Sequence, residues 1–218
     1  MQTAIDTELI EFEGWTMRIR AAQEPEGILL LIHGFTGDEN SMWVFARDLS
    51  PGYWMIAPRA PHPSRTSGYT WRQLQDSDFG KPSLDQFRSP AEALIRLVDA
   101  YQTAAGIPAD QFDVMGFSQG AVLSSVLAFL YPQRVRKVGI LAGFLPSGLE
   151  GLVSSRPLEG KPIFVTHGTK DETVTIDRAK RSMVLLEQAG AQITYCEDDV
   201  GHKVSAGCLQ ALKRFFRD

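Results

Sequence analysis

Short apolar runs that alternate with helical patterns are the feature that most restricts the fold of this chain. Residues 28–32 read Ile-Leu-Leu-Leu-Ile, without the alternation of a strand that has one face in water. An unbroken run of this length is typical of a strand covered on both faces. Similar runs occupy residues 53–57, 112–115, 138–141 and 162–165, and a weaker one occupies residues 193–196.

Helical patterns separate these runs. Ser89-Pro90 is typical of an N-cap and a first helical position, and Gly106 of a helix end. Strands that alternate with helices predict an α/β fold, in which a mostly parallel central sheet has helices on both faces. Apolar residues at helical spacing predict helices over residues 91–105, 120–130, 177–189 and 205–217, of which the second is apolar almost all round and is expected to be deeply buried.

Two segments lie outside this alternation. Residues 8–13 and 15–20 flank Gly14 and are spaced to form an N-terminal antiparallel hairpin. Residues 58–89 form a long segment rich in Pro, Ser and Gly, and long ordered loops are more often functional than linking. Neither an internal repeat nor a composition break marks a second domain. At about 150 residues per domain, we expect a single domain over residues 1–218.

Composition excludes several classes of protein. The chain has 22 Lys and Arg against 26 Asp and Glu, and this net charge of −4 argues against a nucleic-acid binder, which needs a basic face. The two cysteines, Cys196 and Cys208, form no CxxC pair, so we expect buried free thiols, as suits a reducing compartment. No signal-peptide pattern and no apolar run long enough to span a bilayer are visible, so we expect a cytoplasmic protein without stable membrane insertion.

The most informative motif is Gly116-Phe117-Ser118-Gln119-Gly120, which matches G-x-S-x-G and lies between a predicted strand and the predicted buried helix. A sharp turn from strand to helix puts the serine in a strained backbone conformation, and side chains two residues to either side would collide. The turn lifts the Ser118 hydroxyl above the sheet edge, and the helix N-terminus directs N–H groups towards negative charge. The motif therefore predicts Ser118 as a nucleophile.

A serine hydroxyl needs a base to take its proton, and a carboxylate to orient that base. His202 lies in a loop between the last predicted strand and the last predicted helix, and Asp171 follows the preceding strand by a few residues. The chain order Ser118, Asp171, His202 is the order of nucleophile, acid and base in enzymes that carry this elbow. We expect His167 to be a buried structural residue beside Asp171. Besides His167 and His202, the chain has two other histidines, His33 and His62.

Three other aspartates compete for the role of the acid. Asp198 and Asp199 are nearer to His202 in sequence, but they precede it in the same loop, where a solvated turn is the simpler interpretation. Asp113 lies on the strand that leads to the elbow, and we expect it to point away from the face of Ser118. Asp171 remains the preferred acid.

Five short segments carry a resemblance to a known family: residues 31–35, residues 57–61 followed by Trp71, and residues 116–120, 167–171 and 201–202. Together they resemble the phospholipase/carboxylesterase family of the α/β-hydrolase superfamily, which includes acyl-protein thioesterases. The resemblance implies an α/β-hydrolase fold without an inserted cap domain, and it assigns the triad to the same three residues. It also implies an oxyanion hole built from the backbone amides of Phe35 and Gln119.

Two departures from the family pattern are visible. The family usually has Leu-Gly-Asp after its His-Gly pair, whereas this chain has Phe35-Thr36-Gly37-Asp38. The second oxyanion donor is thus a bulky phenylalanine, which we expect to shape the acyl pocket differently. The final glycine of the family's G-F-S-Q-G-G is Ala121 here, and we expect this small residue to change little.

The sequence thus predicts a serine hydrolase that cleaves small carboxylic esters or thioesters through an acyl-enzyme, without metal or organic cofactor. We expect Phe35, Trp71 and Phe79 to line the substrate pocket, with plain packing under a loop as the alternative for Phe79. A homodimer is compatible with the sequence.

Two other interpretations remain. One is a hydrolase-fold binding protein without catalysis, which the intact trio of residues disfavours. The other is a serine hydrolase of another substrate class, such as a small peptidase or a dienelactone-type hydrolase. The dienelactone-type enzymes normally carry cysteine at the position of Ser118, which argues against this choice.

Overall fold

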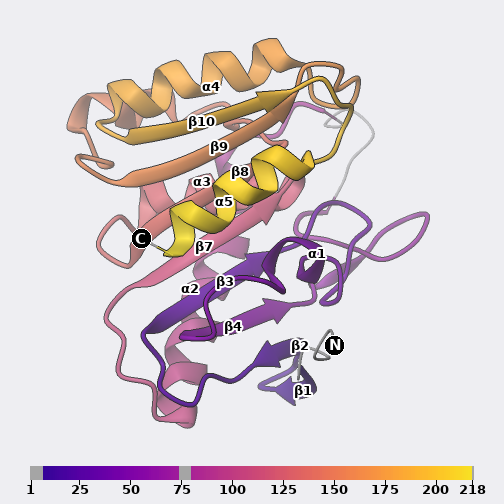
Figure 1. Cartoon of the computed structure of the whole chain (residues 1–218), viewed down its shortest axis with the longest axis vertical. Helices are drawn as coiled ribbons and strands as arrows, with labels where there is room; N and C mark the ends of the chain where they lie inside the picture. The colour runs from indigo at the N-terminus through magenta and orange to yellow at the C-terminus, as the bar shows by residue number, and fades with distance from the viewer. Residues whose placement is uncertain (1–6, 74–79, 218) are drawn as a thin grey trace.

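An eight-stranded sheet runs through the centre of the molecule (Figure 1). The computed structural model describes residues 7–73 and 80–217. The strand order is β1-β2-β4-β3-β7-β8-β9-β10; β2 is antiparallel to both of its neighbours, and all other pairs are parallel. The predicted hairpin and the mostly parallel sheet are therefore confirmed. The strands of this sheet are β1 (Glu8–Phe12), β2 (Trp15–Arg20), β3 (Gly27–Ile32), β4 (Tyr53–Pro58), β7 (Phe112–Phe117), β8 (Val135–Leu141), β9 (Pro162–Gly168) and β10 (Gln192–Asp198).

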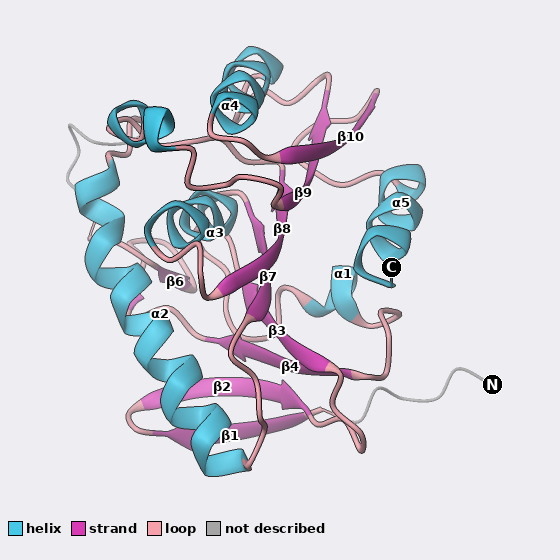
Figure 2. Ribbon diagram, turned by 90° about the vertical axis from the view of Figure 1, so that its left-hand side faces the viewer, coloured by secondary structure: helices cyan, strands magenta, loops and turns pink. Residues whose placement is uncertain are grey.

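Helices cover both faces of the sheet (Figure 2). The helices α2 and α3 lie on one side, and α1 and α5 lie on the other. Within the described residues, each helix is too short or too polar to span a bilayer. The helices are α1 (Trp43–Ala46), α2 (Leu84–Ala105), α3 (Gln119–Leu130), α4 (Ile176–Gln188) and α5 (Ala206–Arg217), and a 3₁₀ helix spans Glu150–Ser155.

The central strand β3 explains why its sequence shows no alternation. Ile28, Leu30 and Ile32 belong to the apolar core on the side of α2 and α3. Leu29 and Leu31 belong to the core on the side of α1 and α5. All five side chains are fully buried, because successive residues of a strand point to opposite faces and both faces are covered.

The start of α2 differs from the prediction. The helix begins at Leu84, and Ser83 and Gln86 form a capping box there, so Pro90 lies inside the helix. The prediction of a helix start at Ser89-Pro90 was wrong because Leu84 and Phe87 continue the buried face of α2 by two more turns. The segment before α2 is correspondingly shorter than expected, and it contains a small antiparallel ribbon of β5 (His62–Pro63) and β6 (Tyr69–Thr70).

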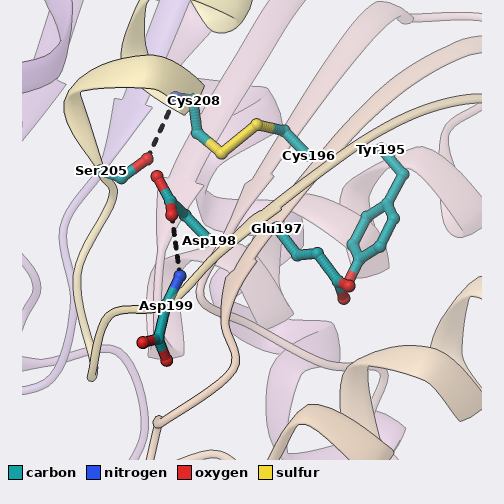
Figure 3. Close-up of a disulfide and its surroundings, with 7 residues drawn as sticks. All are labelled: Tyr195, Cys196, Glu197, Asp198, Asp199, Ser205 and Cys208. Atoms are coloured by element: carbon teal, nitrogen blue, oxygen red, sulfur yellow. Dashed lines mark hydrogen bonds between the residues drawn. A yellow bond between two sulfur atoms is a disulfide. The ribbon is translucent and has the colours of Figure 1, made fainter.

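A disulfide joins Cys196 on β10 to Cys208 on α5 (Figure 3). The expectation of two free thiols was therefore wrong, and the argument for a reducing compartment that rested on it no longer applies. The two residues are 12 positions apart in sequence, but α5 turns back along the sheet and brings their Cα atoms to 5.6 Å. That separation is within the usual range for a disulfide.

Candidate active site

Ser118 occupies a strained turn between β7 and α3. Its φ of +53° lies in the left-handed region that residues other than glycine rarely adopt. A Cβ atom on Gly116 would lie 2.2 Å from the carbonyl oxygen of Gly120, and one on Gly120 would lie 2.0 Å from that of Ile32. Both glycines are thus sterically required, as the motif predicted, and the serine is held at the end of β7.

The structure brings the three predicted side chains into one hydrogen-bonded chain. His202 Nε2 lies 3.0 Å from Ser118 Oγ, and His202 Nδ1 lies 2.6 Å from Asp171 Oδ2. The other carboxylate oxygen of Asp171 accepts hydrogen bonds from the backbone N–H groups of Thr173 and Val174, both at 2.9 Å. An ionised Asp171 only accepts, so Nδ1 of His202 carries a proton and Nε2 is free to accept one from the serine.

The loops that carry Asp171 and His202 are held against each other. A Cβ atom on Gly168, at the end of β9, would lie 2.2 Å from the carbonyl oxygen of Val200, so only glycine allows this approach. The backbone N–H of Lys170 donates to the same carbonyl at 3.0 Å. These contacts fix the distance between two residues that are 31 positions apart in the chain.

His167 lies beside Asp171, as expected, and supports the loop of that residue. Its ring is buried, and Nε2 lies 2.7 Å from the carbonyl oxygen of Val174 and 3.3 Å from Asp171 Oδ2. A carbonyl oxygen only accepts, so Nε2 carries the proton. The hydrogen bond to Val174 therefore holds the ring beside Asp171.

The three competing aspartates have other contacts, and Asp198 is exposed and accepts the backbone N–H of Asp199 at 2.8 Å. Asp113, near the start of β7, is fully buried and forms an ion pair with Arg136, whose Nη2 lies 2.8 Å from Oδ2. Tyr53 donates to the same carboxylate, and burial together with that carboxylate raises the pKa of the tyrosine. Asp199 is exposed and pairs with Lys170 at 2.7 Å. These contacts fit structural roles for Asp113 and Asp199.

The two backbone amides expected to form an oxyanion hole belong to segments near Ser118. Gln119 is the first residue of α3, so its N–H has no acceptor within the helix. Phe35 follows Gly34, where an added Cβ would lie 3.3 Å from Ser118 Cβ, so the loop after β3 runs close to the serine. The side-chain oxygen of Gln119 also accepts a hydrogen bond from the backbone N–H of Trp71 at 2.9 Å, which ties α3 to the loop after β6.

His33 fixes the backbone before Phe35. Its Nδ1 lies 2.7 Å from the carbonyl oxygen of Gly34, and its Nε2 accepts the backbone N–H of Ala60 at 3.0 Å. These partners require a neutral ring with its proton on Nδ1, and burial lowers the pKa of His33 below its ordinary value. Trp71 Nε1 donates to the carbonyl oxygen of His33 at 2.8 Å. Trp71 is fully buried and supports this loop. The prediction that Trp71 lines the pocket beside Ser118 was therefore wrong.

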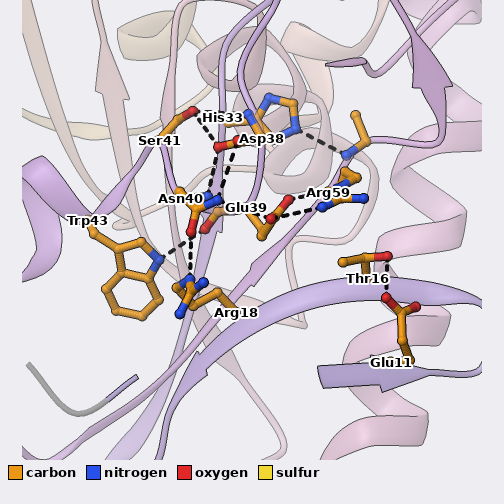
Figure 4. Close-up of polar contacts among 11 residues, drawn as sticks. Glu11, Thr16, Arg18, His33, Asp38, Glu39, Asn40, Ser41, Trp43 and Arg59 are labelled. Atoms are coloured by element: carbon orange, nitrogen blue, oxygen red, sulfur yellow. Dashed lines mark hydrogen bonds and ion pairs between the residues drawn. The ribbon is translucent and has the colours of Figure 1, made fainter. Parts of the chain in front are cut away.

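A polar cluster holds the loop that follows Phe35 (Figure 4). Asp38 accepts hydrogen bonds from the Asn40 backbone and the Ser41 hydroxyl, at 2.9 and 3.1 Å. Arg59 binds both carboxylate oxygens of Glu39, at 2.7 and 2.9 Å, and holds the pKa of Glu39 below its usual range. This cluster could not be predicted from the sequence, because Arg59 lies 20 residues from Glu39.

The two departures from the family pattern are accommodated locally. Thr36 has a φ of +67°, and its backbone N–H donates to the carbonyl oxygen of Tyr69 at 3.0 Å, so β6 holds it in this unusual conformation. Ala121 is fully buried, and its Cβ lies where a Cβ on Gly143 would approach to 2.3 Å. The methyl group of Ala121 therefore fits because glycine occupies position 143.

A cavity of about 240 Å³ opens beside Ser118 and His202. Phe35 lines it, as expected, whereas Phe79 lies outside the described residues. Most of its walls could not be predicted, because they come from separate segments: the loop after β6, α2, α3, the loop after β8, and the loop before α4 with the first turn of α4. The apolar side chains of its walls include Phe87, Val122, Phe144 and Val174, and two arginines, Arg72 and Arg178, also line it.

Comparisons with known proteins extend over most of the chain. A family model described as phospholipase/carboxylesterase matches residues 17–218. Acyl-protein thioesterase 1 of Debaryomyces hansenii is 30% identical over 195 residues, which cover 80% of this chain and 82% of that relative. Carboxylesterase SOBER1 of Arabidopsis thaliana is 26% identical over 180 residues, 78% of each chain. The crystal structure of a carboxylesterase from Mesorhizobium loti superposes with a TM-score of 0.80 at 20% identity, covering 96% of this chain and 97% of that one.

Proposed function

Because the chain belongs to the phospholipase/carboxylesterase family, we propose that it hydrolyses small carboxylic esters or thioesters with Ser118 as nucleophile, His202 as base and Asp171 as the acid that orients the base. The observation that carries this proposal is the pair of contacts made by His202, 3.0 Å to Ser118 Oγ and 2.6 Å to Asp171 Oδ2. A base that is hydrogen-bonded to the nucleophile and to an orienting carboxylate is the arrangement that activates a serine.

In the first half of the reaction, Ser118 Oγ attacks the carbonyl carbon of the ester while its proton moves to His202 Nε2. The backbone N–H groups of Gln119 and Phe35 donate hydrogen bonds to the carbonyl oxygen as negative charge develops on it. One such donor is worth roughly 10²- to 10³-fold in rate. The carbon–oxygen or carbon–sulfur bond then breaks, and the leaving group takes the proton from Nε2.

In the second half, water replaces the leaving group. His202 accepts a proton from the water as its oxygen attacks the acyl-enzyme carbonyl, and it returns that proton to Ser118 Oγ when the acid departs. Asp171 stays ionised throughout and stabilises the positively charged ring. Its carboxylate is suited to this role because two backbone N–H groups hold the oxygen that His202 does not use.

Cavity size supports a small substrate. At about 240 Å³, the cavity is slightly smaller than the roughly 300–1,000 Å³ of pockets that enclose drug-sized ligands. Its apolar side chains Phe87, Val122 and Phe144 offer a surface for a short acyl or alcohol group. Relatives are named for both thioesters and carboxylic esters, so both leaving groups belong to the proposal.

Two assays test the proposal: labelling with a fluorophosphonate, which reacts with activated serines, and hydrolysis of short aryl esters. We expect wild-type protein to be labelled and active, and the Ser118→Ala variant to lose both properties while its circular dichroism spectrum is unchanged. Ser155→Ala is the matched control, because Ser155 is exposed on the 3₁₀ helix and distant in sequence from the motifs. Wild-type protein that resists labelling and turns over no ester would support a binding protein instead.

A further inference from the structure

Arg178 is a cation in the wall of the proposed active site that acyl transfer does not require. It lies in the first turn of α4 and lines the same cavity as Ser118 and His202. Its side chain is partly buried, and among the described residues no carboxylate forms an ion pair with it. Burial and the neighbouring Arg181 both lower the pKa of Arg178.

Phe144 fixes the position of the Arg178 guanidinium. The central carbon of that group lies 3.5 Å above the centre of the phenylalanine ring, and Phe144 is itself a wall residue with 8% of its surface exposed. Stacking on an aromatic face uses the flat side of a guanidinium and leaves the N–H groups on its edge. The stack therefore holds a rigid fork of hydrogen-bond donors at the wall of the cavity.

The surroundings of this fork favour an anion. Positive side chains are normally disfavoured in the first turn of a helix, where the helix dipole attracts negative charge. Asp177, the acidic residue of this turn, is exposed, and no Asp or Glu is found among the described residues that line the cavity. Leaving a partly buried cation without an anionic partner costs free energy, which a carboxylate on a ligand would recover.

We propose that the substrate of this esterase carries a carboxylate, which Arg178 binds while Ser118 attacks the ester or thioester carbonyl. This inference rests on the proposed function and specifies its substrate class. A guanidinium and a carboxylate form two parallel N–H···O hydrogen bonds, which fix the orientation of the substrate as well as its charge. The carboxylate belongs either to the acyl group or to the alcohol group, and the experiment separates these two cases.

Two pairs of aryl esters test the inference, each pair differing only in one charge. Mono(4-nitrophenyl) glutarate and its methyl ester carry the charge on the acyl group, and 4-acetoxybenzoate and its methyl ester carry it on the alcohol group. We expect wild-type kcat/KM to favour the charged member of at least one pair by roughly 10- to 100-fold, the usual worth of a charge-assisted hydrogen bond. The difference should lie mainly in KM.

Variants of α4 connect this preference to one side chain. Arg178→Gln should bring the ratio of charged to neutral kcat/KM close to one, and Arg178→Lys should restore part of it, because lysine keeps the charge but lacks the fork. Arg181→Gln is the matched control, since it removes the same charge from an exposed position on the same helix and should leave the ratio unchanged. A wild-type preference for the neutral member of both pairs would overturn the inference, and so would an unchanged ratio in Arg178→Gln.

Calorimetry on the Ser118→Ala variant separates this inference from the proposed function, because it needs no turnover. Mono(4-nitrophenyl) glutarate and 4-acetoxybenzoate are titrated into Ser118→Ala and into the double variant Ser118→Ala with Arg178→Gln. We expect at least one ester to bind at least 10-fold more weakly to the double variant. Equal binding of both esters to the two proteins contradicts the role of Arg178, even where wild-type protein hydrolyses esters. Weaker binding to the double variant supports that role even where no ester is turned over.

Discussion

At the scale of single residues, the site depends on backbone positions that few residue types tolerate. The glycines around Ser118 could be predicted because a sharp turn with a positive φ leaves no space for a Cβ on either side. The unusual φ of Thr36 could not be predicted, because its cause is a hydrogen bond to Tyr69, 33 positions later in the chain. Local sequence therefore revealed the strain that is local in origin and missed the strain imposed by a distant partner.

We expect Gly116→Ala to damage both stability and activity. The new Cβ would meet the carbonyl oxygen of Gly120 at 2.2 Å, so the turn that carries Ser118 must open. Overpacking of this kind should lower the free energy of unfolding by about 1–3 kcal/mol, as measured with urea. The rate at which a fluorophosphonate labels Ser118 should fall by about 10²-fold or more. Gly151→Ala is the control, since a Cβ there meets nothing within 4 Å. Labelling of Gly116→Ala at the wild-type rate would contradict this account of the turn.

Stability should depend on pH through His33. Burial lowers the pKa of this residue in the folded protein, so the unfolded chain takes up a proton at higher pH than the folded one. The stabilisation is complete above the unfolded pKa of about 6.5 and is lost as the pH falls towards the lower folded pKa. His33→Gln keeps an acceptor for the Ala60 N–H but does not titrate, so its unfolding free energy should fall less than that of the wild type between pH 7 and 5. Parallel curves for the two proteins would show that His33 does not contribute.

At the scale of secondary-structure elements, the sequence predicted what neighbouring residues decide. Apolar runs located β3, β4, β7, β8 and β9, because strands buried on both faces are apolar at successive positions. The weaker run located β10, which lies at the edge of the sheet and is only partly buried. The start of α2 was placed too late because Ser89-Pro90 is a local signal of the same kind as the capping box at Ser83, and only the packing of Leu84 and Phe87 decides between them. The disulfide was missed because it depends on how α5 returns to β10.

The disulfide should stabilise the part of the molecule that presents His202, because His202 lies in the segment between Cys196 and Cys208. Closing a loop of this length is worth about 3 kcal/mol through the lost entropy of the unfolded chain. Urea unfolding with and without a thiol reductant should therefore differ by about 2–4 kcal/mol in the wild type. Cys208→Ser should unfold at the lower value under both conditions. A wild type that is insensitive to reductant, with its thiols reduced as shown by alkylation, would contradict this expectation.

In the molecule as a whole, the central sheet brings the residues of the candidate active site together. The segments that carry Phe35, Ser118, Asp171 and His202 follow β3, β7, β9 and β10, and parallel strands deliver such segments to one edge. We propose that residues 1–218 form one domain around this sheet. The three central side chains could be predicted because each belongs to a short motif. The contact between Phe144 and Arg178 could not, since these residues meet across the fold and neither lies in a motif.

Mass spectrometry of the acid-quenched protein tests whether Ser118 forms a covalent acyl intermediate, on which the proposed mechanism depends. Wild-type protein mixed with excess 4-nitrophenyl acetate and quenched within the first turnovers should carry one acetyl group, on the peptide that contains Ser118. His202→Ala should acquire that group at least roughly 10²-fold more slowly, because the nucleophile has lost its base. Hydrolysis of the ester without any acetylated peptide, or with the acetyl group on another residue, would contradict the account.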